Sequence, residues 1–237
     1  MPERLIDARG LNTYYGASHI LRGIDFHVDR GETIGLMGRN GMGKSTLLKT
    51  LMGLVKPRGG SVRIAGRDMT GRAPYEIAQL GVAYVPEGRG IFGNLSVKEN
   101  LQMAARAGTR GQRDWTYERV LETFPRLQER LGHGGQQLSG GEQQMLTIGR
   151  ALMTNPDVLI LDEATEGLAP LIAREIWRIC SLIRESGISS VIVDKNWKHV
   201  TQVTDRNVIL VKGEVVFTSS SDELRAQPRL LDQYLGV

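Results

Sequence analysis

Short apolar runs, each followed by an acidic residue, mark two segments of the chain. VLIL at residues 158–161 precedes Asp162, and VIV at 191–193 precedes Asp194. Runs of this length that are bounded by polar residues are typical of strands buried within a sheet. We therefore predict buried strands over residues 156–163 and 189–194, and another over residues 33–38, TIGLMG.

Apolar positions with helical spacing alternate with these strands. The spacing predicts helices over residues 45–54, 74–80, 143–155 and 168–187, with a polar helix at 221–237. Residues 97–129 are also predicted to be helical, although Gly108, Gly111 and Pro125 interrupt them, and residues 131–142 are predicted to be a loop.

The two ends of the chain show the alternating pattern of strands joined by turns. The first thirty residues predict antiparallel strands, and residues 207–220 predict a hairpin around Lys212 and Gly213. Strands that alternate with helices favour an α/β fold with a mainly parallel sheet and right-handed crossovers. We expect a single domain over residues 1–237, with a helical subdomain inserted at about 88–150.

The composition adds limits on compartment and partners. No run approaches the roughly 20 apolar residues that span a bilayer, so we expect a cytoplasmic protein whose membrane role depends on a partner. The net charge is +4, but no basic and aromatic stripe indicates nucleic-acid binding. Cys180 is the single cysteine and is expected in the core. His19, His27 and His133 lack metal-ligand spacing and are interpreted as surface or loop residues.

A glycine-rich turn joins the predicted strand at 33–38 to the following helix. GRNGMGKST matches the pattern G-x-x-x-x-G-K-[ST]. Glycines let backbone N–H groups surround phosphate oxygens, and the helix N-terminus adds about half a positive charge. In this pattern Lys44 reaches the β- and γ-phosphates, and the Ser45 hydroxyl binds Mg²⁺. The expected nucleotide-binding residues are Gly38, Arg39, Asn40, Gly41, Met42, Gly43, Lys44, Ser45 and Thr46.

Two acids end the strand predicted at 156–163. Ligands bind at the carboxyl ends of strands in parallel sheets. Asp162 is thus placed to hold the coordination shell of Mg²⁺, and Glu163 to polarise the water that attacks the γ-phosphate.

A second glycine turn, LSGGE, lies about twenty residues before this strand. Ser139, Gly140, Gly141 and Glu142 form another potential phosphate nest at a helix N-terminus. A head-to-tail dimer explains two distant nests in one chain, because each nucleotide then lies between the phosphate loop of one copy and the LSGGE turn of another.

The order of a phosphate loop, LSGGE and LDE resembles the ABC-transporter ATPases over essentially the whole chain. PEGR, SGGEQQML, IGRALM, EGLAP and YLGV are similar to the LivF-type ATPases of branched-chain amino acid importers, and urea and short-amide importers have closely similar ATPases. The resemblance implies a P-loop NTPase core with an N-terminal antiparallel β subdomain and an inserted helical subdomain. It also implies ATP and Mg²⁺ as cofactors.

The implied partners are a second ATPase, identical or a sister chain, and membrane permease subunits on the inner face of the cell membrane. A periplasmic solute-binding protein is implied indirectly. A short permease helix is expected in a groove near residues 87–92. The sequence leaves open the transported solute, the choice of homodimer or heterodimer, and whether the isolated chain hydrolyses ATP.

Further roles follow from the resemblance. Tyr15 occupies the place of the aromatic that stacks on adenine, with Tyr14 as the alternative. Glu87 stands where a glutamine commonly senses Mg²⁺, and Ser139 and Gly141 should touch the γ-phosphate bound by the partner.

Three positions depart from the wider family. Ala164 replaces the usual proline and Ala169 replaces a common aspartate. Lys195 stands where a histidine usually contacts the γ-phosphate, and His199 is not its substitute. Lys195 either reaches the γ-phosphate as a permanent cation or points to solvent.

Three other functions fit the sequence less well. A non-transport ABC ATPase would carry a long coiled coil or tandem ATPase domains, which this chain lacks. A regulatory subunit that hydrolyses poorly is disfavoured by Glu163, although Lys195 leaves room for it. An exporter or lipid-extraction ATPase is disfavoured by PEGR and EQQM.

Overall fold

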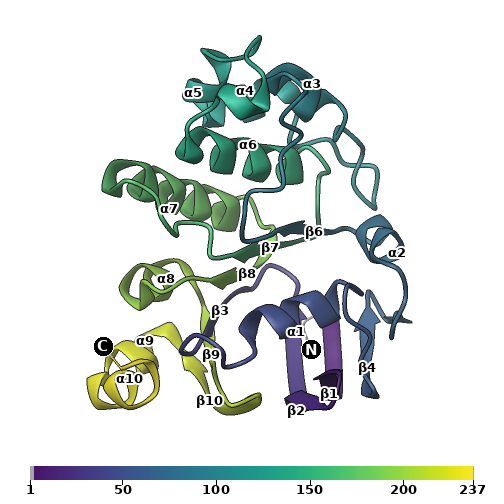
Figure 1. Ribbon diagram of the computed structural model, residues 1–237, viewed down its shortest axis with the longest axis vertical. Coiled ribbons are helices and arrows are strands. Elements are labelled where there is room, and N and C mark those ends of the chain that lie inside the picture. Colours follow the sequence, from purple (N-terminus) through teal and green to yellow (C-terminus); the bar gives the residue numbers. More distant parts are fainter. Residues whose placement is uncertain (1–2, 237) are drawn as a thin grey trace.

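A mainly parallel six-stranded sheet forms the centre of the computed structural model, which describes residues 3–236 (Figure 1). Its strands run in the order β10-β9-β3-β8-β7-β6, and only β10 pairs antiparallel to its neighbour. This confirms the α/β core. The strands are β3 (Thr33–Met37), β6 (Val82–Val85), β7 (Val158–Asp162), β8 (Ser189–Val193), β9 (Arg206–Val211) and β10 (Glu214–Ser220).

A smaller antiparallel sheet contains the first strands of the chain. Its order is β2-β1-β4-β5, and β1 pairs with both β2 and β4. The predicted N-terminal β subdomain is therefore confirmed. The strands are β1 (Arg4–Tyr15), β2 (Ser18–Asp29), β4 (Gly59–Ile64) and β5 (Arg67–Asp68).

Six of the described helices precede or follow strands of the larger sheet. They are α1 (Lys44–Leu51), α2 (Pro74–Gln79), α7 (Pro170–Glu185), α8 (Trp197–Val203), α9 (Ser221–Arg225) and α10 (Pro228–Leu235). Helix α8 was not predicted, because its two turns are too short for a clear helical period. The single helix predicted at 221–237 is wrong in its continuity, since a new helix begins at Pro228 and proline cannot continue a helix interior.

The helices between β6 and β7 lie on the side of the larger sheet that faces away from the smaller sheet (Figure 1). They are α3 (Val97–Gln102), α4 (Tyr117–Thr123), α5 (Pro125–Gln128), the 3₁₀ turn η1 (Gly135–Gln137) and α6 (Gly140–Leu152). The loop predicted at 131–142 extends too far, because Gly140–Glu142 form the first turn of α6. Ser139 caps that turn, which offsets the poor helix propensity of two glycines.

Both faces of the larger sheet are covered by apolar residues. In β7, Leu159 and Leu161 belong to a core shared with the helices around α6 and α7, whereas Val158 and Ile160 belong to a core shared with α1 and the smaller sheet. Side chains alternate between the two faces of a strand, so both sets must be apolar. Cys180 is buried in the first core as expected, and burial raises the pKa of its thiol to about 12.

Candidate active site

A cavity of about 400 Å³ opens where strands β3, β7 and β8 end. It brings the predicted phosphate loop together with Glu87, about 40 residues further along the chain, and with Glu163, Glu166 and Lys195, which are more than a hundred residues away. The lining residues are Ile20, Asn40, Gly41, Gly43, Lys44, Ser45, Thr46, Glu87, Glu163, Glu166 and Lys195.

Glycine conformations shape the loop between β3 and α1. Gly38 and Gly43 have φ values of +143° and +104°, which side-chain-bearing residues rarely adopt. A Cβ on Gly38 would also lie 2.4 Å from the Leu210 carbonyl oxygen. The loop thus wraps tightly before α1 begins at Lys44, and the N-terminus of α1 faces the cavity.

Lys44 is a buried cation in this loop. Its Nζ donates hydrogen bonds to the backbone carbonyls of Gly38 (2.8 Å) and Arg39 (3.1 Å). Burial lowers the pKa of Lys44, although the nearby Glu163 carboxylate opposes that shift. The ammonium is therefore held at the cavity wall by neutral carbonyls only, and an anion in the cavity would be a stronger partner.

Asp162 is held at the end of β7 by two hydroxyl groups. Ser45 Oγ donates to Asp162 Oδ1 at 3.4 Å, and Tyr84 Oη donates to Oδ2 at 3.0 Å. Burial raises the pKa of Asp162, and these two hydrogen bonds oppose the shift. Tyr84 was missed by sequence reasoning; its only signal is its position near the end of the neighbouring strand β6.

Glu163 occupies a strained turn directly after β7. Its φ is +52°, and its backbone N–H donates to the Val193 carbonyl at 2.8 Å. A cluster of carboxylates surrounds this turn, because one oxygen of each side chain lies within 4.8 Å of the others in the set Glu87, Glu163 and Glu166. Of the three predicted Mg²⁺ ligands, Ser45 and Asp162 are thus hydrogen-bonded to each other, whereas Glu87 lies beside Glu163 and Glu166.

The crowding of carboxylates controls protonation at Glu163. The pKa of Glu163 is raised to about 7, mainly by burial and then by the hydrogen bond and the charge of Glu166. The hydrogen bonds from Glu163 and Lys195 lower the pKa of Glu166. Lys195 Nζ forms an ion pair with Glu166 and lies 3.9 Å from Glu163 Oε2. Neither sequence alternative for Lys195 anticipated this partner, and Glu166 was missed because nothing singled it out.

The pKa of Glu163 gives a testable dependence of stability on pH. Between the ordinary glutamate pKa and about 7, the folded chain keeps a proton on Glu163 that the unfolded chain releases. Stability from this group therefore falls as pH rises through that window. We expect the melting temperature of Glu163→Gln, measured without nucleotide, to fall less than that of the wild type between pH 5 and pH 8. Exposed Glu185→Gln is the matched control, and equal pH dependence in all three proteins would contradict this assignment.

The LSGGE turn lies apart from the cavity. Ser139 Oγ donates to Glu142 Oε2 at 2.7 Å, and Ser139 N–H donates to the same oxygen at 2.8 Å. None of the turn's residues, all of which the structure describes, lines the cavity. Gly141 packs so closely on α7 that a Cβ there would lie 2.6 Å from Ile172. The two predicted phosphate nests are therefore separate within one chain.

The two candidate adenine-stacking residues differ in their surroundings. The Tyr14 ring stacks on His19 with centroids 4.1 Å apart, and the Arg58 guanidinium lies 4.5 Å from its centroid. Tyr15, at the end of β1, is 47% exposed. Neither tyrosine lines the cavity. Since Tyr14 is already engaged, Tyr15 is the ring available to a ligand.

An apolar groove of about 500 Å³ lies between α2, β6 and α6. Its lining includes Tyr75, Pro86, Gly90 and Arg150. Tyr75 is 66% exposed, and Arg150 donates to the Gly90 carbonyl at 2.7 Å. The groove thus begins beside Glu87 and continues along the surface of α6.

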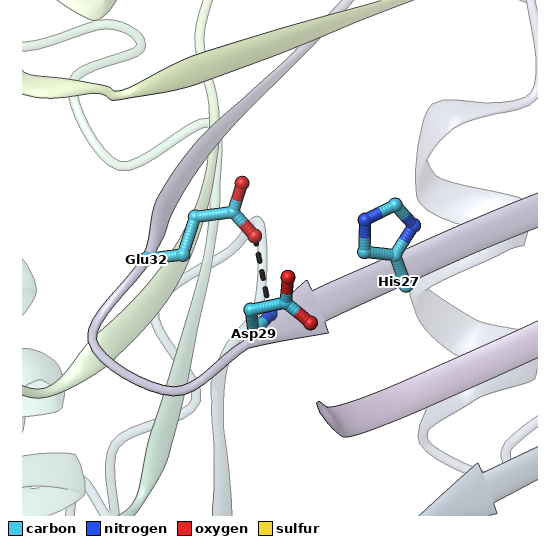
Figure 2. Close-up of side chains that lie close together, drawn as sticks. All are labelled: His27, Asp29 and Glu32. Atoms are coloured by element: carbon cyan, nitrogen blue, oxygen red, sulfur yellow. Dashed lines mark hydrogen bonds between the residues drawn. The ribbon is translucent and has the colours of Figure 1, made fainter. Parts of the chain in front are cut away.

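A second group of possible metal ligands lies away from the cavity (Figure 2). His27, Asp29 and Glu32 gather near the end of β2. His27 and His19 both lie in this strand and are half-buried, so of the prediction that they are surface or loop residues, only the loop is contradicted. Both oxygens of Glu32 accept hydrogen bonds from Arg206, at 2.6 and 2.9 Å. Because Arg206 already neutralises Glu32, we interpret this group as an ion pair and not as a metal centre.

This ion pair should contribute to stability. The side chains of Glu32 and Arg206 are 17% and 18% exposed. Removing one partner leaves the other charge largely buried, which costs about 3–5 kcal/mol. We expect Glu32→Gln to lower the free energy of unfolding in urea by roughly that amount. The double variant Glu32→Gln/Arg206→Met should recover part of the loss, whereas a single variant as stable as the wild type would contradict the expectation.

Comparisons with known proteins agree with this geometry. Residues 21–166 match the family model described as "ABC transporter". BraG of Pseudomonas aeruginosa, a high-affinity branched-chain amino acid transport ATP-binding protein, is 40% identical over 95% of this chain and 97% of its own. A probable branched-chain amino acid transport ATP-binding protein, LivF of Archaeoglobus fulgidus, is 33% identical over 96% of this chain and 97% of its own. A solved ATP-binding subunit of an ABC transporter is 30% identical, with a TM-score of 0.82 over 98% of this chain and 96% of that one.

No helix within residues 3–236 has the length and apolar character needed to cross a membrane.

Proposed function

This chain belongs to the ABC transporter family and is an ATPase, and from that premise we propose that it drives an importer of branched-chain amino acids. The observation that carries the proposal is the cavity in which the glycine-rich loop, Lys44 and Glu163 meet. The fold and the family account for ATP as the ligand. The import role rests on the names of the relatives.

The phosphates of ATP are proposed to lie against the loop at 38–46 and the N-terminus of α1. Backbone N–H groups and the helix dipole favour phosphate there. Lys44 would exchange its carbonyl partners for the β- and γ-phosphates. The adenine would stack on Tyr15, which has an exposed ring.

Mg²⁺ fits the oxygen donors beside the phosphates. Ser45 Oγ and Asp162 Oδ1 already lie 3.4 Å apart, and hydroxyl and carboxylate oxygens are the ligands that Mg²⁺ prefers. Glu87 is the third proposed ligand. When bound, the ion would neutralise charge on the transferred phosphoryl group. Tyr84 fixes the second oxygen of Asp162, which keeps the first directed at Ser45.

Glu163 is the proposed base or water-orienting group. It follows β7 directly, and its strained turn directs the carboxylate into the cavity. Hydrolysis then depends on positioning and electrostatics around an in-line water. Lys195 lines the same cavity and is proposed to contact the γ-phosphate in place of the usual histidine.

A head-to-tail dimer is proposed to complete each site. The LSGGE turn lies outside the cavity of its own chain, so Ser139, Gly140, Gly141 and Glu142 are available to the nucleotide of a partner. For Ser139 this requires its hydroxyl to release Glu142. The partner is a second copy or a sister ATPase, and each subunit is proposed to be one domain with a helical insertion at about 88–150.

The apolar groove between α2, β6 and α6 is proposed to receive a short permease helix. It adjoins Glu87, so nucleotide state and permease position would be coupled through the segment that follows β6. Through this contact the chain would attach to the cytoplasmic face of the membrane, with a periplasmic binding protein delivering the solute.

Uptake in cells tests the transport proposal. In a strain that lacks this chain, re-expression of the wild type should restore uptake of radiolabelled leucine, isoleucine and valine, whereas Glu163→Gln should not. Urea and a short amide are the matched comparison solutes. Restored urea uptake without leucine uptake would replace the proposed solute with the alternative, and no effect on any solute would oppose an import role.

A further inference from the structure

Lys195 and Glu166 come from two loops that hydrogen bonds hold together. Glu166 follows β7 and Lys195 follows β8, and these strands are parallel neighbours. Between the loops, Thr165 Oγ1 donates to Asp194 Oδ2 at 2.5 Å, and the Thr165 N–H donates to the same oxygen at 3.3 Å. Both loops therefore have fixed positions, which bring the ammonium and the carboxylate into contact.

This ion pair lies on the wall of the nucleotide cavity. Both side chains line it together with Lys44. Lys195 is 53% exposed, and its second carboxylate neighbour, Glu163, is 3.9 Å away. A half-exposed lysine with one close partner can rotate about its flexible stem at little cost, because exposed ion pairs contribute at most about 1 kcal/mol.

We infer that Lys195 exchanges partners when ATP binds: it pairs with Glu166 in the empty site and moves to the γ-phosphate in the filled one. Glu166 is then a positioning residue that holds Lys195 beside the cavity and is released by the triphosphate. This inference rests on the proposed placement of ATP.

Charge determines the direction of the exchange. The terminal phosphate of ATP carries more negative charge than one carboxylate and offers several acceptor oxygens, so it is the stronger partner for an ammonium. ADP places no phosphate at the terminal position, and its binding leaves the Lys195–Glu166 pair intact. The exchange therefore occurs when a nucleoside triphosphate binds and not when a diphosphate binds.

The released carboxylate lies in the loop that leads into α7. Gly167, with φ of +68°, and Ala169 separate Glu166 from Pro170, where α7 begins.

The test compares a non-hydrolysable ATP analogue with ADP, each with Mg²⁺, by isothermal titration calorimetry. The ratio of the two dissociation constants measures the preference for the γ-phosphate. Glu166→Gln should raise this preference about threefold to tenfold, because Lys195 no longer leaves a partner and a repelling charge is removed. Lys195→Met should lower it about tenfold. Exposed Lys198→Met and Glu185→Gln are the matched controls and should not change it.

The double variant Lys195→Met/Glu166→Gln separates exchange from a fixed pair. If Lys195 stays on Glu166, the pair is neutral in both states, and the double variant keeps the wild-type preference. If Lys195 moves, the double variant falls several-fold below the wild type. A wild-type ratio in the double variant, or in Lys195→Met alone, overturns the inference. ADP affinity reports folding and nucleotide binding in each variant, so wild-type protein that binds neither nucleotide would instead overturn the proposed function.

Discussion

Replacing Glu163 with glutamine is expected to lower the rate of ATP hydrolysis by roughly 10²- to 10³-fold, because the variant loses a positioned group of the general acid–base type. Glutamine has nearly the same shape but cannot accept the proton of the attacking water. The side chain lines the cavity directly after β7. Its neighbour Glu166 lies in the same loop, whereas Glu87 follows β6. Release of inorganic phosphate from MgATP provides the measurement.

Affinity should separate this effect from loss of structure. Glu163→Gln should bind ATP within about threefold of the wild type or more tightly, because removal of a carboxylate reduces repulsion of the phosphates. Glu185→Gln, on the exposed face of α7, should hydrolyse ATP at the wild-type rate. A hydrolysis rate for Glu163→Gln within tenfold of the wild type would remove Glu163 from its proposed role.

Replacing Lys44 with methionine is expected to weaken ATP binding about 100-fold, which corresponds to roughly 3 kcal/mol. In the structure the ammonium bonds only to the carbonyls of Gly38 and Arg39, so it is available to phosphate oxygens. Charge-assisted hydrogen bonds are about twice as strong as neutral ones. Methionine keeps the aliphatic stem and removes only the donor.

Fluorescence titration with a labelled ATP analogue measures this loss. Lys49→Met is the matched control, because Lys49 lies on the exposed face of the same helix and is absent from the cavity lining. Its affinity should stay within twofold of the wild type. Equal losses in the two variants would show that general charge attraction, and not contact at Lys44, accounts for the effect.

Features determined by local sequence were predictable. The strand at β7 was recognised because both of its faces are buried, which leaves a run of apolar residues between polar ones. The loop before α1 was recognised because positive φ values and close backbone approach require glycine there. Asp162 and Glu163 followed from the rule that sites lie at the carboxyl ends of parallel strands.

Features determined by strand order were not predictable. Tyr84 meets Asp162 because β6 pairs with β7, and Lys195 meets Glu166 because β7 pairs with β8. The sequence carries no signal for which strands become neighbours, so these contacts could not be foreseen.

The apolar side chains of β7 are divided between two cores, and this limits which segments of the chain can be separated from one another. Leu159 and Leu161 pack in the same cluster as Leu101, Val120 and other residues of the short helices before β7. A fragment of residues 88–150 alone would lack β7, so the apolar side chains of its helices that pack on β7 would be exposed to water. Excising residues 88–150 would uncover part of one face of the sheet, because α7 and α8 would then have to cover it without α6. Protein engineers who wish to transplant the helical region should therefore carry β7 with it.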